Sequence, residues 1–310
     1  MPSMKVVKRR INSVTTTKKI MKAMNMVAAS KLQKDKARLE AARPFLNGAQ
    51  EAVNALIGCP EADGNEFVAG RKNNGIKTAV SSGNGHTAGR EIVVRPGLKS
   101  AAYLVITGDR GLCGAYNTNV IKKALEFIEV GENPKIIVIG LKGFDYFIRH
   151  GKKVFHKFDN VLETAFYDDA ERIGNYLLSL YSSGEIDEAY MAFTRFESAL
   201  SHIPGVERLL PLRDDFESIN INKNDNMKYD PDIGSYLGHA IPFYINAFIY
   251  AALLESSACE QAARMVSMDT AVSNASDIKD KLTRVYNRRR QAAITQEISE
   301  LVSSANANGQ

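Results

Sequence analysis

The chain has 310 residues, of which 45% are hydrophobic and 24% are charged, and its formal net charge is +5. This length predicts about two domains of roughly 150 residues, with enough apolar side chains for a real core. The three cysteines are far apart and form no CxxC pair, which excludes a disulfide framework or zinc site of the usual spacing. The longest apolar stretch, 240–254, is shorter than the about 18 residues of a membrane span and contains Asn246.

The first expected element is a long helix that begins near Ser3 and ends before Gly58. Apolar or small residues recur along it at alternating spacings of three and four, at Ile11, Val14, Met21, Ala28, Leu32, Leu39, Ala42, Leu46, Ala49, Val53 and Leu56. Only Lys18, Asn25 and Asp35 interrupt this seam. A seam of seven heptads predicts a coiled coil, although Pro44 predicts a kink or a local break.

The N-terminal part of this helix is strongly basic. Residues 1–43 contain twelve Lys or Arg but only two acidic residues, Asp35 and Glu40, which gives a net charge of +10. A basic helix is typical of proteins that bind nucleic acid, an anionic membrane surface or an acidic protein collar. Acid-poor N-termini also resemble mitochondrial transit peptides. Because the apolar seam continues through this region, we expect a structural helix and no signal or transit peptide.

Residues 58–97 contain eight glycines and few large apolar side chains. Such a composition buries too little surface to offset the entropy of ordering. We therefore expect a long loop or a disordered insert between the first helix and the next element.

An alternation of strands and helices follows from residue 100. We expect strands at 101–107, 135–140 and 189–196, an edge strand at 206–212, and helices at 118–130, 142–150 and 164–181. This order predicts a Rossmann-like, three-layer α/β domain with a parallel sheet.

A polar link at 220–232 leads into a second long helix with the same kind of seam. Its seam positions are Leu254, Ala258, Gln261, Met265, Met268, Val272, Ala275, Ile278, Leu282, Val285, Ile298 and Leu301. The two long helices would measure roughly 80 and 100 Å at the α-helical rise, far beyond the width of a small domain. The expected fold class is therefore α/β with a coiled coil of the N- and C-terminal helices.

Candidates for chemistry are weak. The loop 107–114 (TGDRGLCG) lies where a phosphate loop would lie, but it fits neither GxGxxG nor GxxxxGK[ST]. It is either a nucleotide loop or a tight structural turn. Cys113 is either a nucleophile near a helix N-terminus or a small buried apolar residue. The five histidines show no metal-ligand spacing, so we expect no metal and no cofactor.

Four collinear segments resemble the signature motifs of ATP synthase gamma subunits. They are KAMNMVAASK at 22–31, DRGLCG at 109–114, EQAARM at 260–265 and YN through QAAITQE at 286–297. The resemblance spans the chain except for the glycine-rich insert. Two departures are visible: Ala115 stands where the family usually has a glycine, and Ser304-Ala305 stands where it has Gly-Ala.

The resemblance implies a rotor shaft with no catalytic residue of its own. The terminal helices would form an antiparallel coiled coil inside a ring of three alpha and three beta subunits. The α/β domain would lie at the foot, beside the epsilon subunit and the membrane ring of c subunits. Rotation of the shaft would couple ion transport to ATP synthesis or hydrolysis. No nucleic acid and no direct small-molecule substrate is implied.

The motifs also imply positions of contact. Met24 would face an acidic loop of a beta subunit, and Arg264, Gln291 and Thr295 would hold the catalytic head. Tyr229 and Asp230 match a foot segment near the ring and the epsilon subunit. Beyond the reach of the first helix we expect the C-terminal helix to be small and polar all round. The chain would be peripheral, on the cytoplasmic face of a bacterial plasma membrane.

The expected organisation has four parts. They are an N-terminal shaft helix at 1–57, a glycine-rich insert at 58–99, a foot domain at 100–220 and a C-terminal shaft helix at 221–310. Two alternatives remain open from the residues alone: a coiled coil that binds nucleic acid through its basic helix, and an enzyme that uses Cys113.

Overall fold

The computed structural model describes residues 4–57, 59, 62, 64–70, 100–131, 133–212 and 232–307, with side chains as far as 302. It divides into two compact units. We call Lys31–Ala263 the α/β unit, and Met1–Ser30 with Arg264–Gln310 the terminal unit. Residues 71–99 of the expected insert, and the foot positions Tyr229 and Asp230, lie outside the described residues.

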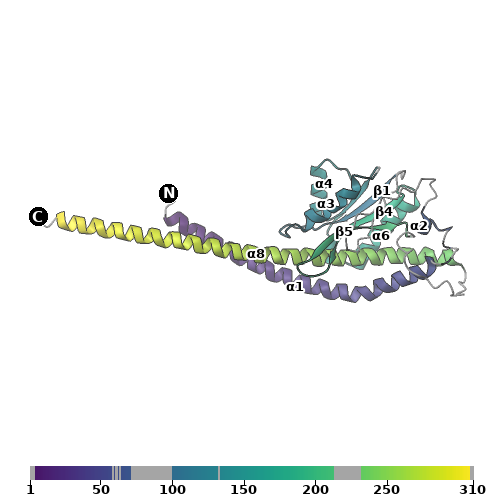
Figure 1. The fold of residues 1–310 in the computed structure, drawn as a ribbon, viewed down its shortest axis with the longest axis horizontal. Coiled ribbons are helices and arrows are strands. Elements are labelled where there is room, and N and C mark those ends of the chain that lie inside the picture. The colour runs from purple at the N-terminus through teal and green to yellow at the C-terminus, as the bar shows by residue number, and fades with distance from the viewer. Residues whose placement is uncertain are drawn as a thin grey trace, which may run out of the picture. The chain divides into compact units, whose positions relative to one another are not determined.

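The α/β unit is built on a five-stranded sheet with the order β3-β2-β1-β4-β5 (Figure 1). The strands are β1 (Ala101–Ile106), β2 (Lys135–Ile139), β3 (Val154–Phe158), β4 (Glu188–Phe196) and β5 (His202–Leu210). The first four run parallel, and β5 pairs antiparallel with β4. The sheet is therefore mixed: four strands form the predicted parallel sheet, and the edge strand β5 is antiparallel.

The antiparallel edge has a simple cause. Only residues 197–201 separate β4 from β5, and a parallel crossover needs a dozen or more. The sequence also failed to predict β3, an edge strand that pairs only with β2. His156 and Lys157 interrupt its apolar pattern, as charged residues commonly do on exposed strand edges.

Helices cover both faces of the sheet, which makes three layers as predicted (Figure 1). One face packs against α3 (Tyr116–Ile128) and α4 (Leu141–Arg149). The other packs against α6 (Tyr167–Ser182) and the parts of α1 (Met4–Ile57) and α8 (Ile233–Ala307) that belong to this unit. Alternate side chains of β1 enter the two cores, as the period of a strand requires.

Two helix predictions need correction. The helix expected at 164–181 is two helices, α5 (Val161–Thr164) and α6, because Ala165 adopts a left-handed conformation with φ of 44°. The helix α1 continues through Pro44 instead of breaking there. The expected loop after α1 contains a short helix, α2 (Glu66–Ala69), in which the Phe67 N–H donates to the Asn65 side chain.

The helix α8 contains an 18-residue window with a mean hydropathy of 1.5. By length and composition alone this helix could cross a membrane, contrary to the expectation from the sequence. However, 61% of the window is buried inside the protein. Leu237, Ile245 and Leu253 of α8 belong to the main apolar core of the α/β unit, so this part of the helix has the role of a core helix.

Candidate partner-binding surface of the terminal helices

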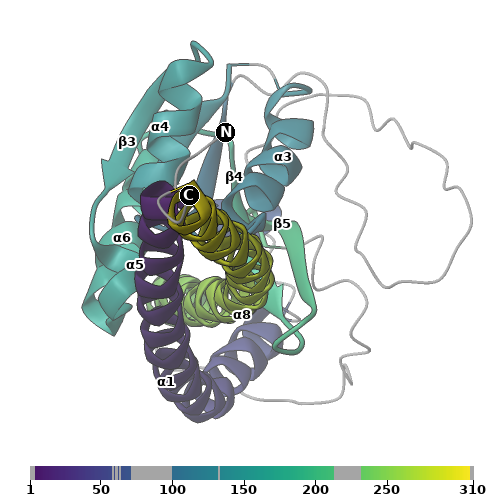
Figure 2. The ribbon, with the colours of Figure 1, turned by 90° about the vertical axis from the view of Figure 1, so that its left-hand side faces the viewer.

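In the terminal unit, α1 and α8 run antiparallel, side by side (Figure 2). The Lys18 Nζ donates to the Ser276 Oγ at 2.9 Å, and the Asn25 Nδ2 donates to the main-chain oxygen of Met265 at 2.9 Å. From Lys18 to Asn25 the residue number on α1 rises, while the number of the bonded residue on α8 falls from 276 to 265, so the two helices run in opposite directions. These bonds link the polar seam positions of α1 to α8 and fix the register of the pair.

The third polar seam position lies in the α/β unit. Asp35 is 9% exposed, and its Oδ2 accepts a hydrogen bond of 2.8 Å from the Ser257 hydroxyl of α8. Burial raises the pKa of Asp35, while the Ser257 bond and the charges of Arg38, Lys31 and Lys34 oppose that shift. Each of the three residues that interrupt the seam therefore has a hydrogen-bond partner on α8.

The net positive charge of the chain is concentrated in the terminal unit. Residues 1–30 and 264–310 contain fourteen Lys or Arg and five Asp or Glu, a net charge of +9. Since the whole chain carries +5, residues 31–263 carry −4. A surface of this charge attracts an acidic partner and repels a basic one.

Met24 is half-buried on a largely exposed face of α1. Ile20 and Val27 lie one turn to either side of it and are 56% and 57% exposed. The spacing of i, i+4 and i+7 places all three on one helix face. Lys19 and Lys22 are exposed beside them. This face can therefore contact a partner that presents apolar and acidic side chains together.

The other expected contact residues differ in accessibility. Arg264 is only 8% exposed, so most of its side chain is covered within this chain. Gln291 and Thr295 are exposed one turn apart on α8. The Thr295 hydroxyl donates to the main-chain oxygen of Gln291 at 2.9 Å, so its oxygen can still accept a hydrogen bond from a partner, beside the exposed Gln291 amide.

The sequence-based interpretation that the C-terminal part of α8 is small and polar all round was wrong. Ile294, Ile298, Leu301 and Val302 are 46%, 56%, 69% and 54% exposed. Their spacing of i, i+4, i+7 and i+8 forms one apolar stripe, which we call the C-terminal stripe. The residue types alone could have revealed it, because the stripe continues the seam past the end of the α1 pairing.

The loop that resembles a phosphate loop is occupied by the protein itself. The Gly108 N–H donates to the Asn117 Oδ1 at 2.8 Å, and the Asp109 Oδ1 accepts from the Leu141 N–H at 2.9 Å. The Glu260 carboxylate lies against Gly108, so that a Cβ atom there would come 2.8 Å from its Cδ. The Gly108 donor is used, and the Glu260 side chain fills the space beside it. These contacts favour the structural turn over a nucleotide site.

Cys113 fits its structural interpretation. It is 2% exposed and accepts a hydrogen bond of 3.1 Å from the Asn117 Nδ2. It packs in a buried cluster with Tyr116 and Cys259, whose pKa values are both raised mainly by burial. Within the described part of the chain, no group of three or more His, Cys, Asp or Glu is arranged to hold a metal ion.

Comparison with known proteins identifies relatives over the full length. A family model described as ATP synthase matches residues 3–307. The ATP synthase gamma chain of Alkaliphilus metalliredigens is 37% identical over 308 residues, covering 98% of each chain. That of Desulforamulus reducens is 35% identical over 309 residues, covering 99% of each. A chain of the Euglena gracilis mitochondrial ATP synthase, solved in rotational state 3, shares the fold with a TM-score of 0.65 at 17% identity. The match covers 98% of this chain and 94% of that one.

Proposed function

Since the chain belongs to the ATP synthase gamma family, we propose that its terminal helices are the rotor shaft of an F-type ATP synthase. The observation that carries this proposal is the terminal unit: an antiparallel helix pair with a net charge of +9 and exposed apolar stripes. Such a surface is complementary to surrounding partner subunits that present acidic and apolar side chains. The partners are three alpha and three beta subunits, the epsilon subunit and the membrane ring of c subunits.

The shaft acts by its asymmetry and is not itself catalytic. Two different helices face the ring of partner subunits, so each catalytic site meets a different surface of the shaft at any angle. A contact that is stronger with one conformation of a site shifts the population toward that conformation. Rotation then moves this preference from site to site and couples ion transport to ATP synthesis or hydrolysis.

Within this proposal, four residues contact the alpha/beta head. Met24, on its apolar face beside Lys19 and Lys22, meets an acidic loop of a beta subunit. Gln291 and Thr295 contact the alpha/beta head from an exposed face of α8. Arg264 contributes the small part of its surface that is not covered. The C-terminal stripe supplies the apolar part of the same contact.

The rest of the chain has the supporting roles expected from the sequence. We assign 1–57 and 221–310 to the shaft, 100–220 to the foot and 58–99 to an insert between them. Tyr229 and Asp230 belong to the foot surface near the ring and the epsilon subunit. The relatives are gamma chains of bacterial enzymes, and we place this chain as a peripheral subunit on the cytoplasmic face of the plasma membrane.

Assembly with its partners tests the proposal. The full chain is mixed with the alpha and beta subunits encoded by the same genome, and the products are weighed by native mass spectrometry. We expect one copy of the chain with three copies of each partner, in a complex that hydrolyses ATP. Alpha and beta subunits that assemble without retaining the chain would refute the shaft. Double-stranded DNA serves as the competing ligand, because the nucleic-acid alternative requires binding that weakens steeply with salt.

A further inference from the structure

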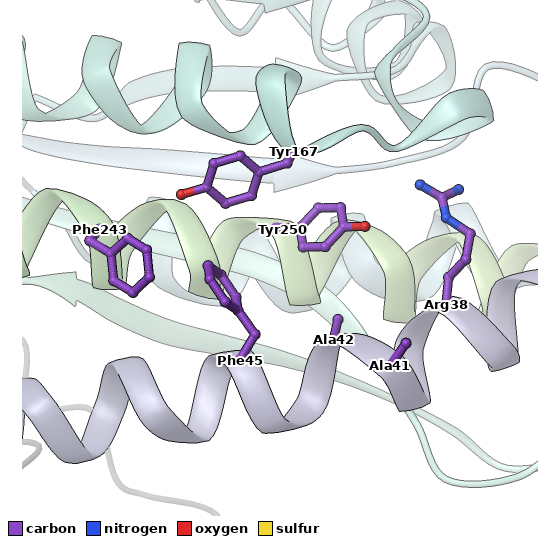
Figure 3. Close-up of a pocket in the computed structure, with 7 residues that line it drawn as sticks. All are labelled: Arg38, Ala41, Ala42, Phe45, Tyr167, Phe243 and Tyr250. Carbon is purple, nitrogen blue, oxygen red and sulfur yellow. The ribbon is translucent and has the colours of Figure 1, made fainter.

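A pocket of about 490 Å³ opens on the α/β unit between α1, α6 and α8 (Figure 3). Its walls are almost entirely aromatic or small: Phe45 and Ala41 come from α1, Tyr167 from α6, and Phe243 and Tyr250 from α8. Its volume is within the range of about 300–1,000 Å³ that small-molecule sites occupy. The shaft function proposed above gives it no role.

The aromatic side chains touch each other by their edges and leave ring surface open. Phe45 meets Phe243 with centroids 4.9 Å apart at 69°, and meets Tyr167 at 5.9 Å and 86°. Tyr167 in turn meets Tyr250 at 5.7 Å and 76°. Phe45 and Phe243 remain 39% and 43% exposed. Exposed aromatic rings gathered in a concave site favour an occupant that covers them.

One end of the pocket is cationic. Figure 3 shows the Arg38 guanidinium and the Tyr250 hydroxyl at this end, with Phe243 at the other. The Arg38 Nη1 donates to the Thr164 oxygen at 2.8 Å, and its Nη2 donates to the Ala165 oxygen at 2.6 Å. Carbonyl oxygens hold the group in place but do not neutralise its charge, and a guanidinium has five N–H donors in all.

Asp35, one turn earlier on α1, interacts electrostatically with Arg38, but its side chain already accepts the Ser257 hydroxyl. Among the described residues, no carboxylate forms an ion pair with Arg38 within 4.0 Å. The pocket therefore joins an apolar body to one fixed positive charge at its end.

We propose that this pocket binds a small amphipathic anion, with an aromatic or branched aliphatic body and a single carboxylate or sulfonate. The body lies against Phe45, Phe243 and the ring of Tyr167. The acid group lies at Arg38, where the Tyr250 hydroxyl can donate a second hydrogen bond. A ligand in this position contacts α1 and α8 at once and stabilises their packing in the α/β unit.

Two probes that differ only by a sulfonate group test the proposal on the full chain. Anilinonaphthalene sulfonate carries the acid group, and N-phenyl-1-naphthylamine has the same rings without it. Equilibrium dialysis and fluorescence titration should give one saturable sulfonate site per chain. Arg38→Gln should weaken sulfonate binding about tenfold, as expected for one charge-assisted contact, and change binding of the neutral probe less than twofold. Arg149→Gln, at an exposed position of α4, is the matched control and should change neither.

A second variant fills the pocket without removing a core contact. Ala41 is exposed and lines the pocket, so Ala41→Trp should abolish saturable binding of both probes while circular dichroism and thermal unfolding stay unchanged. Ala52→Trp places the same side chain at another exposed position of α1 as its control. Sulfonate binding that does not saturate, or that survives Ala41→Trp, would overturn the site. Equal loss of both probes in Arg38→Gln would overturn the preference for an anion.

Discussion

Gly174 of α6 packs so closely against Asn246 of α8 that a Cβ atom on Gly174 would overlap the Asn246 Oδ1. Asn246 is 5% exposed, and its Oδ1 accepts no hydrogen bond from the described residues. The contact lets α6 and α8 approach each other over the sheet of the α/β unit. It places a glycine and a small amide where larger side chains would force the helices apart.

We therefore expect Gly174→Ala to lower the free energy of unfolding by about 1–3 kcal/mol, the usual cost of overpacking. Asn246→Ala should recover much of that loss in the double variant, because it removes the atom that the new methyl group meets. Urea unfolding of the four chains measures the coupling. Gly238→Ala is the control, since α8 has open space there, and it should be neutral or stabilising. An equal cost of Gly174→Ala in both backgrounds would exclude the steric explanation.

The buried Asp35 carboxylate should make stability depend on pH. Burial raises its folded-state pKa above the ordinary 3.8, so the folded chain holds a proton that the unfolded chain has released. Stability from this group is then present at low pH and is lost as pH rises through the folded pKa. Asp35→Asn keeps an oxygen for the Ser257 hydroxyl. We expect it to be more stable than the natural chain at pH 7, with a difference that shrinks toward pH 4.

Urea unfolding at both pH values checks this expectation. Glu40→Gln is the control, because Glu40 is exposed on the same helix and its removal changes the net charge equally. A variant that is less stable than the natural chain at pH 7 would show that the ionised Asp35 is favourable where it lies.

Met24→Lys should impair coupling without unfolding the chain. The side chain is half-buried on an α1 face that already carries Lys19 and Lys22. A further cation there over-stabilises the contact with an acidic loop in one rotary state. We expect assembly and thermal unfolding close to those of the natural chain, with less ion pumping per ATP hydrolysed in reconstituted vesicles. Pumping at the natural ratio would contradict the proposed contact.

The C-terminal stripe should matter for assembly and not for folding. Ile298 and Leu301 are more than half exposed, so replacing both by serine removes little buried surface from the chain itself. If partner subunits cover them, each loses about 1 kcal/mol or more of apolar contact, and the complex weakens at least tenfold. Binding of the variant to the alpha and beta subunits measures the effect. Ile148→Ser, at a 52% exposed position of α4, is the control.

The strongly periodic parts of the chain were predictable from the sequence. The seam from Ile11 to Leu56 is buried or half-buried at its predicted positions. A heptad pattern puts its apolar residues on one helix face, and that face packs against the partner helix. The strands β1, β2 and β4 were equally visible, since their residues are buried on both faces. The family was recognisable from four motifs.

What was missed depends on context that no local pattern carries. The edge strand β3 lacks a continuous apolar run, and the break at Ala165 depends on a left-handed backbone at a residue that usually favours helix. The ring contacts of Phe45 arise from packing between distant segments. The contact residues on the shaft stay predictions, because their partners are other chains.

The carboxylate of Glu260 at Gly108 has a consequence for a protein that works beside nucleotide sites. A Rossmann-like strand, loop and helix commonly receives a phosphate at this point, but here the Asn117 side chain accepts the Gly108 N–H group and the buried Glu260 side chain fills the space beside it. The loop therefore offers neither the free Gly108 N–H donor nor the open space that ATP, ADP or phosphate would need there. The chain can therefore lie beside sites that bind these molecules without offering them this loop as a second site.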